Sequence, residues 1–300
     1  MYFSMMRRFG FVLMLVSVTS SAMGCAVDAR DESATTAPDI VTSFETFDTA
    51  VTSVRVDATP TSPHLMLGTP ADADASDDYL LTKTNYALSY NDGKHVPNWV
   101  AWKLQASDLG SVARKDSFTA DHTLPTGFYE VTNTDYKRSG YSRGHMCPSA
   151  DRTSTAAANN ETFLFTNIVP QTTELNSGPW ERLETYVRNA ASRGSDMYIV
   201  SGSLFASTPP TIGNNVAVPS YNYKIVVTLP HGGALADVTA TTPIVAVNMP
   251  NAHTLPSKAW TDYKVTLAEV ERLSGYRFLT ALAPQIHDAL ATAHTVAVDE

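Results

Sequence analysis

Six short apolar runs of strand character constrain the fold of this chain more than any other feature of its sequence. In the first, residues 86–90, large apolar side chains alternate with small or polar ones, which is the two-residue period of a strand. The run 163–169 is rich in aromatic and branched residues, and Pro170 is expected to end it. The other runs are 99–104, 197–200, 223–229 and 244–247.

Two segments carry the signals of helices. Gly178-Pro179 places proline at the first position of a helix, and Arg193-Gly194 closes it. A shorter helix is expected over 265–273, closed by Gly275. Strands outnumber helices and are grouped along the chain, so the sequence predicts an α+β fold with a mixed central sheet.

Residues 1–24 have the anatomy of a secretory signal peptide. Arg7 and Arg8 precede an apolar run over 9–18, and small residues dominate 20–24. The apolar run is shorter than the roughly 20 residues that a membrane-spanning helix needs. A buried N-terminal helix is the alternative, but the order of charge, apolar run and small residues favours export.

Cys25 follows the small residues at once, in an arrangement that resembles a bacterial lipobox with Ala22 where leucine is usual. A lipidated Cys25 would attach the mature protein to a membrane, whereas an unmodified chain would be released. Secreted, periplasmic and membrane-anchored locations therefore stay open. A disulfide to Cys147 is excluded if Cys25 is lipidated, and Cys147 is then most simply a small buried hydrophobic residue.

An acidic segment of low complexity follows over residues 25–76. It is rich in Ala, Thr, Ser, Asp and Pro, shows little apolar periodicity and carries a net charge of −7. This composition is typical of a flexible linker. We therefore expect one folded domain over 77–290 and a short tail over 291–300.

Three polar motifs stand out within the expected domain. They are Tyr-Ser-Arg-Gly-His-Met-Cys-Pro at 141–148, Thr-Asn-Ile-Val-Pro-Gln at 166–171 and Leu-Asn-Ser-Gly-Pro-Trp-Glu-Arg-Leu-Glu at 175–184. In their order and spacing they resemble the DNA/RNA non-specific endonuclease family, whose active site is a ββα-metal motif. The resemblance covers about residues 77–285. It implies a metal-dependent endonuclease with that motif beside its sheet.

His145 is the candidate general base. Hydrolysis of a phosphodiester needs an activated water, and a neutral histidine can accept its proton near pH 7, because the unperturbed pKa is about 6.5. A lone histidine is more often structural, but the preceding Arg143-Gly144 and the asparagines of the later motifs favour catalysis. Gly144 is expected to let the backbone approach the substrate closely.

The resemblance assigns direct metal ligation to Asn176 and makes Glu184 the acceptor for a water on the metal. Mg²⁺ keeps several waters and needs only one or two protein oxygens, so this set fits Mg²⁺, or Mn²⁺ in its place, better than Zn²⁺. The alternative roles are a helix cap for Asn176 and a solvated helix face for Glu184.

The resemblance also implies roles for Asn167, Arg143 and Arg114. Asn167 matches the position that orients the catalytic histidine or the site around it; its alternative is a buried polar residue bonded to a neighbouring strand. Both arginines would bind the phosphate and stabilise its transition state. Arg114 is matched by position alone, with a surface salt bridge as its alternative. Ser142 replaces the aspartate frequent in the family, which affects the orientation of Arg143.

The expected reaction is in-line attack by a water that His145 deprotonates, leaving 5′-phosphate ends on DNA and RNA by family analogy. Contacts confined to phosphates would make cleavage indifferent to base sequence and sugar. The chain carries −9 overall but +3 over 137–152, and a hydrolase needs positive charge only where the scissile phosphate binds. The alternatives are a non-catalytic nucleic-acid-binding surface lipoprotein on a nuclease fold, which would not need His145 or Asn176, and a toxin nuclease with a delivery domain.

Overall fold

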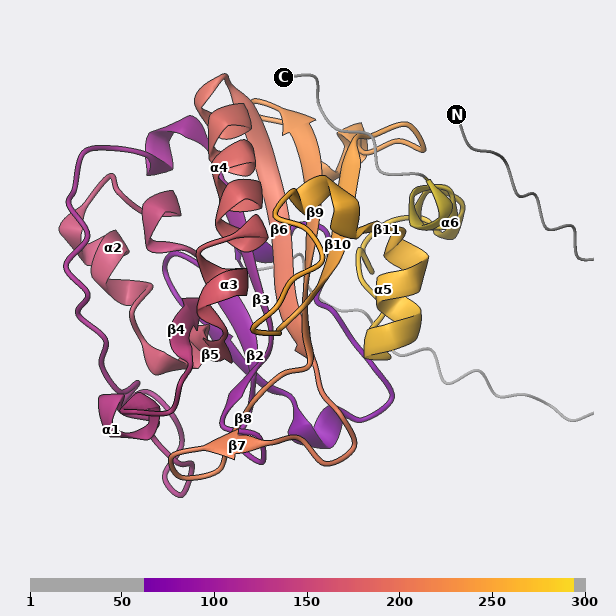
Figure 1. The fold of residues 1–300 in the computed structure, drawn as a ribbon. Coiled ribbons are helices and arrows are strands. Elements are labelled where there is room, and N and C mark those ends of the chain that lie inside the picture. The colour runs from indigo at the N-terminus through magenta and orange to yellow at the C-terminus, as the bar shows by residue number, and fades with distance from the viewer. Residues whose placement is uncertain (1–61, 294–300) are drawn as a thin grey trace, which may run out of the picture. The chain divides into compact units, whose positions relative to one another are not determined.

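A seven-stranded antiparallel sheet organises residues 62–293, the part of the chain that the computed structural model describes (Figure 1). Its strand order is β1-β2-β3-β6-β9-β10-β11, and every neighbouring pair is antiparallel. In that order the strands are Tyr79–Thr82, Ala87–Asn91, Val96–Leu104, Ser195–Leu204, Tyr221–Pro230, Ile244–Pro250 and Lys264–Val265.

Two small sheets and six α-helices complete the described part. The small sheets pair β4 (Ser142–His145) with β5 (Ile168–Gln171), and β7 (Thr211–Ile212) with β8 (Val216–Ala217). The helices are α1 Asn133–Tyr136, α2 Ala156–Glu161, α3 Thr173–Asn176, α4 Pro179–Ser192, α5 Leu267–Ser274 and α6 Pro284–Thr292. The α+β class expected from the sequence is confirmed, but the central sheet is antiparallel at every pairing rather than mixed.

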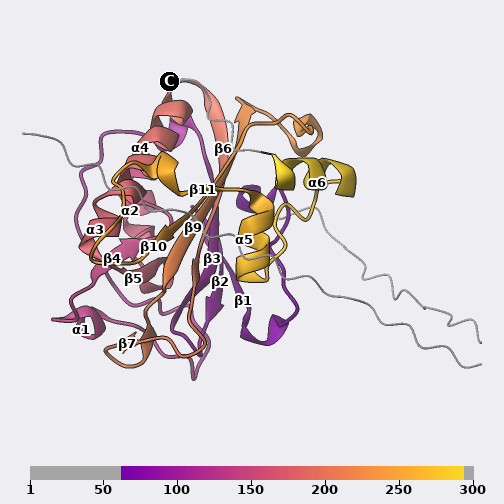
Figure 2. The same cartoon turned by 45° about the vertical axis from the view of Figure 1, so that its right-hand side comes forward.

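Both faces of the large sheet are covered (Figure 2). Along β3, Val100, Trp102 and Leu104 join a core cluster beneath α4 and the β4–β5 ribbon, whereas Trp99 and Ala101 join a second cluster beneath α5 and α6. Alternate residues of a strand point to opposite faces, so a strand between two cores is apolar throughout. The sheet is therefore the buried middle layer, and the three motifs lie on its α4 side.

Helix α4 follows the predicted bounds. Pro179 takes its first position, and the chain leaves the helix through Gly194, whose φ of +99° is in the left-handed region that suits glycine. Trp180, Leu183 and Val187 are buried against the sheet. The predicted second helix is α5, which begins two residues later than expected and ends at Ser274, with the left-handed Gly275 as its C-cap.

The run 163–169 is not the strand that its composition predicts. A 3₁₀ turn occupies Phe165–Asn167, and β5 begins only at Ile168. The burial of these aromatic residues comes from a turn that packs inward rather than from a strand. Pro170 does not end β5 either. The Met146 N–H donates to the Asn167 carbonyl, so bonded positions alternate along the ribbon and leave Pro170 where no N–H is needed.

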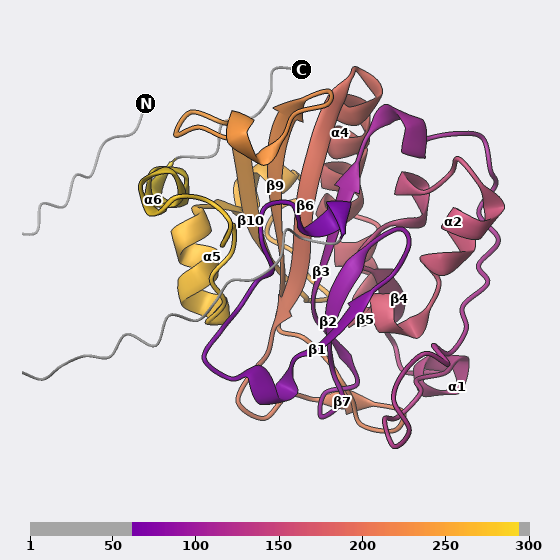
Figure 3. The ribbon, with the colours of Figure 1, turned by 180° about the vertical axis from the view of Figure 1, so that it is seen from behind.

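Residues 62–76, assigned to the linker from composition, contribute to the core of the domain. Leu65 and Leu67 are buried in the second cluster, and Ala71 forms an antiparallel bridge with Arg277. Figure 3 shows this indigo segment crossing β3 on the face opposite α4. The folded region therefore begins upstream of residue 77. So short a segment has no periodicity that would reveal its packing.

The remaining N-terminal features predicted from sequence lie outside the described residues, and so does most of the tail. These are the signal peptide, Cys25 and the linker up to residue 61. None of the helices within 62–293 has the length and apolar character needed to cross a membrane. Cys147 is buried with a free thiol, as expected for a small hydrophobic residue.

Removal of residues 62–76 should destabilise the domain. A chain that starts at Ser62 keeps the buried Leu65 and Leu67, whereas one that starts at Asp77 loses both. Burial of a leucine side chain contributes about 1.5–3 kcal/mol, so the shorter chain should lose roughly 3–6 kcal/mol of unfolding free energy. Urea denaturation of both chains measures the difference. Equal midpoints would show that the segment does not stabilise the fold.

Candidate active site

The β4–β5 ribbon and the two helices after it bring the three motifs together. His145 is the last residue of β4, Asn176 is the last residue of α3, and Glu184 lies on α4. All three line a hollow of about 520 Å³, which we call the catalytic hollow. Its other polar lining residues are Arg114, Ser149, Ser177, Glu181 and Arg188. The arrangement is the ββα motif implied by the resemblance.

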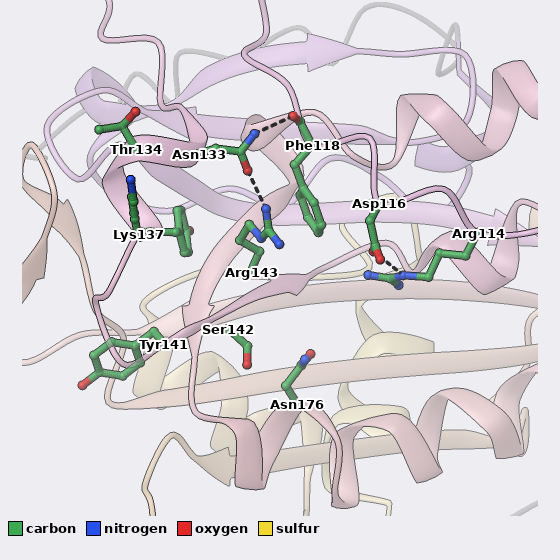
Figure 4. A pocket seen from close by; sticks show the side chains of 11 residues that line it. Arg114, Asp116, Phe118, Asn133, Thr134, Lys137, Tyr141, Ser142, Arg143 and Asn176 are labelled. Carbon is green, nitrogen blue, oxygen red and sulfur yellow. Dashed lines mark hydrogen bonds and ion pairs between the residues drawn. The ribbon is translucent and has the colours of Figure 1, made fainter.

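A second hollow of about 660 Å³ adjoins the first, and Arg114 and Asn176 line both (Figure 4). Arg143 lines only this larger hollow. Asn167, the remaining residue predicted from the sequence, lines neither. All predicted site residues except Asn167 thus line one or both hollows, whereas Asn167 lies behind them.

His145 is a buried imidazole with an unused nitrogen. Its side chain lies between Phe118 and Phe163, with ring centroids 5.2 and 4.8 Å away, and the residue is only 6% exposed. Its Nε2 has no hydrogen-bond partner within the described chain. Burial, together with the nearby charges of Arg114 and Arg143, lowers the pKa of His145 to about 3. The ring is therefore neutral at pH 7 and can accept a proton.

Asn167 holds the backbone just beyond His145 and is fully buried. Its amide donates to the Cys147 carbonyl at 2.9 Å, its oxygen accepts from the Cys147 N–H at 2.9 Å, and the amide also donates to the Thr162 carbonyl at 2.8 Å. Its side chain bonds backbone groups and not the imidazole itself. The asparagine therefore fixes the end of β4, and through it the position of His145.

Gly144 is required for a reason that differs from the predicted approach of substrate. A Cβ atom at Gly144 would lie 2.2 Å from the side-chain oxygen of Gln171, the residue that ends β5. Gln171 is fully buried over the ribbon. A larger residue than glycine would displace this side chain and disturb the strand that carries His145.

Arg143 is held by neutral groups. Its guanidinium donates to the Asn133 side-chain oxygen at 2.5 Å and lies over the Phe118 ring, 4.1 Å from its centroid. Arg114 instead pairs with Asp116 at 2.7 Å and donates to Ser149 at 3.1 Å. The surface salt bridge weighed for Arg114 is therefore present, yet the guanidinium still lines both hollows (Figure 4).

Glu184 belongs to a buried network of charges beneath the catalytic hollow. It accepts a bond from Lys224 at 3.2 Å and lies 4.0 Å from Arg188, which is 3.4 Å from Asp151. Burial raises the pKa of Glu184, and the Lys224 charge opposes that shift. Lys224 itself is 1% exposed, with its ammonium 4.1 Å from the Trp180 ring centroid. The carboxylate thus has a cation on each side.

Three members of this network were not among the predicted site residues. Arg188 lies one helical turn after Glu184 on α4, a spacing that could have identified it. Lys224 lies within an apolar strand, and Asp151 belongs to none of the three motifs. Trp102 on β3 donates to Asp151 at 2.9 Å. These partners come from separate segments, and only the fold brings them together.

The catalytic hollow offers oxygen donors suited to a hard divalent cation. Asn176 points into the space between the hollows and forms no bond to the other residues drawn in Figure 4. Glu181 and Glu184 supply carboxylates on the same side. Over 62–293 the one cluster of three acidic, His or Cys side chains close enough to hold an ion is Asp72, Asp77 and Asp78, none of which lines this hollow. A sparse oxygen set fits an ion that keeps its waters.

Comparison with known proteins decides the family. The sequence profile of the DNA/RNA non-specific endonucleases matches residues 68–285. The chain belongs to this family. A nuclease from Nostoc sp. is 45% identical over 234 residues, which cover 76% of this chain and 85% of that protein.

More distant relatives share the same domain. The human mitochondrial nuclease EXOG is 37% identical over 216 residues, which cover 66% of this chain but 56% of that protein. A solved structure of EndoG in complex with EndoGI superposes with a TM-score of 0.63 at 28% identity, covering 76% of this chain and 95% of that one. The predicted family and its α+β nuclease fold are therefore confirmed.

Replacement of His145 should reduce the loss of unfolding free energy that accompanies a fall in pH. The unfolded chain protonates this ring near pH 6.5, whereas the folded ring stays neutral to about pH 3. Between these values the unfolded state binds one more proton, so stability falls as the pH falls, by about 1.4 kcal/mol per pH unit. Urea unfolding of His145→Gln from pH 6 to 4 should show a slope lower by about that amount.

Asn189→Ala, which changes an exposed residue and removes no titratable group, supplies the control for this experiment and should keep the slope of the parent protein. Identical slopes for the parent and His145→Gln would show that the folded ring is not held neutral.

Proposed function

We propose that this chain is an exported, magnesium-dependent endonuclease that hydrolyses phosphodiester bonds of DNA and RNA with little sequence preference and leaves 5′-phosphate ends. One observation carries the proposal: a buried, neutral His145 borders a hollow that also presents Asn176, Glu184 and Arg114. A proton acceptor, oxygen donors for a cation and a guanidinium for phosphate thus face the same space.

The arginines bind and polarise the phosphate. Arg143 and Arg114 offer forked N–H donors to its non-bridging oxygens, which gain negative charge as the pentacoordinate transition state forms. Arg143 is already oriented by Asn133 and Phe118, so little side-chain entropy is lost when the phosphate binds. The arginine N–H donors therefore act on the phosphate oxygens where negative charge develops.

His145 takes the proton of the attacking water. A base with a pKa near 3 accepts a proton weakly, but part of that depression comes from the charges of Arg114 and Arg143. A phosphate bound to both arginines compensates these charges, so the basicity of His145 rises when the substrate is in place. Burial keeps the ring neutral until then.

Asn176 would hold the cation through its side-chain oxygen, and Glu184 would receive hydrogen bonds from the ion's hydration shell. When bound, the ion supplies positive charge that stabilises the transition state and the departing 3′-oxygen. Mg²⁺ suits these oxygen donors, and Mn²⁺ could replace it. Lys224 and Arg188 oppose the rise that burial causes in the pKa of Glu184, which favours its charged form for this role.

Contacts that address phosphates rather than base edges support a broad substrate range. The cationic and amide groups of the two hollows address charge and sugar-phosphate oxygens, which carry no sequence information. The signal-peptide pattern of residues 1–24 supports export of the enzyme, either released or attached through a lipid on Cys25. A role limited to binding would require neither the neutral His145 nor the free Asn176 amide.

Cleavage should require a divalent cation and depend on Asn176. The purified chain should degrade double-stranded DNA, single-stranded DNA and RNA in Mg²⁺ and stop when EDTA is added. Asn176→Ala should weaken metal affinity, so that about 10–100-fold more Mg²⁺ or Mn²⁺ is needed for half-maximal rate. Asn189→Ala, on an exposed position of α4 that lines neither hollow, is the control.

A metal titration of the plasmid-nicking rate measures both effects. Full activity in EDTA would exclude the metal. An unchanged metal dependence in Asn176→Ala would assign the ion to other residues.

A further inference from the structure

The larger hollow extends well beyond the groups that the proposed hydrolysis uses. Its volume of about 660 Å³ lies in the range of small-molecule sites. Arg114 and Asn176, shared with the catalytic hollow, line one part of it, and Lys137 and Tyr141 lie on the other side of Arg143 and Ser142 (Figure 4). A chain that enters the catalytic hollow therefore has a continuous path into this second space.

The larger hollow carries uncompensated positive charge. Arg114, Lys137 and Arg143 line it against Asp116 alone, and Asp116 is paired with Arg114. Arg143 is held by the neutral Asn133 and Phe118. No carboxylate within 62–293 forms an ion pair with Lys137. Two cations are thus left for an anionic ligand, and the distal one is Lys137.

A tight turn fixes Lys137 and Tyr141 at this end of the hollow. Lys137 directly follows α1, and its N–H bonds the Thr134 carbonyl at 3.2 Å. Arg138 and Gly140 then adopt left-handed φ values of +59° and +83°, which return the chain to Tyr141. A left-handed arginine costs energy and persists only where the surrounding structure enforces it. The turn thus sets Lys137 opposite the start of β4.

The ring of Tyr141 is supported from behind. It lies 5.9 Å from the ring of His253, which is 3.4 Å from the Glu174 carboxylate. Tyr141 is half-buried and lines the hollow with its remaining surface. An aromatic surface beside a phosphate-binding cation is the combination with which proteins bind single-stranded nucleic acids, since every base offers a flat face to the ring.

We propose, on the basis of the proposed function, that the larger hollow is a subsite for the nucleotide next to the scissile phosphodiester. Lys137 binds the following phosphate of the strand, and the ring of Tyr141 contacts the nucleoside between the two phosphates. The subsite recognises the charge of the phosphate and the flat face of the nucleoside, so it adds affinity without base preference. It makes the enzyme favour substrates with a phosphate beyond the one that is cut.

Two short substrates separate the contacts. The first is thymidylyl-thymidine, which has one phosphodiester and no other phosphate; the second is the same dinucleotide with phosphates on both ends. Lys137→Gln should lower kcat/KM about tenfold for the second substrate and leave the first unchanged within twofold. Lys258→Gln, an exposed lysine that lines neither hollow, should change neither. An equal loss on both substrates, or none, would overturn the role of Lys137.

Tyr141 is tested with the same pair. Tyr141→Ala should raise KM about tenfold on both substrates, because the nucleoside is common to them, and Tyr141→Phe should restore the parent value. A KM for Tyr141→Ala equal to that of the parent would remove the residue from the subsite.

A binding measurement does not depend on turnover. In a His145→Ala background, a 12-nucleotide single strand should bind with a salt dependence that Lys137→Gln reduces by about 0.7 in the slope of log K against log salt concentration, the contribution of one phosphate contact. An unchanged slope would contradict the proposal. Failure of the parent protein to cleave any nucleic acid would instead reject the proposed function and leave the slope as the measure of the subsite.

Discussion

The burial of a neutral imidazole is the constraint on which the rest of the site depends. His145 lies between two phenylalanine rings near two guanidinium groups, and all of these oppose its protonation. The ring keeps this place because Asn167 bonds both backbone groups of Cys147 and so fixes the strand end. Gly144 and Gln171 complete that support. The strand end that carries the imidazole is thus held by residues that line neither hollow.

A second constraint lies beneath the hollow, where buried carboxylates need cations. Glu184 and Asp151 are stabilised by Lys224 and Arg188, and removal of one partner of a buried ion pair typically costs about 3–5 kcal/mol. The Lys224 ammonium lies over the Trp180 ring, so this buried charge contacts the apolar core directly. Stability and chemistry share this network, so the helix that presents Glu184 is also the one that closes the core over the sheet.

The sequence predicts most of this architecture but not its internal contacts. Strands β2, β3, β6, β9 and β10 follow from short apolar runs, and helix α4 follows from proline and glycine at its ends. The prediction of a strand over 163–169 was wrong because a turn that packs its aromatic residues inward has the same composition as a strand. Arg188 could be reached from helical spacing. Lys224 and Leu65 could not, because their partners lie far away along the chain and only tertiary packing defines them.

The rate of His145→Ala tests the central claim most directly. Single-turnover cleavage of a labelled duplex in saturating Mg²⁺ should fall by at least 10²–10⁴-fold at neutral pH, the usual contribution of a positioned base. The residual rate should rise with pH, since hydroxide can replace the missing acceptor. Near-normal cleavage by His145→Ala at pH 7 would contradict the account and assign the proton to another group.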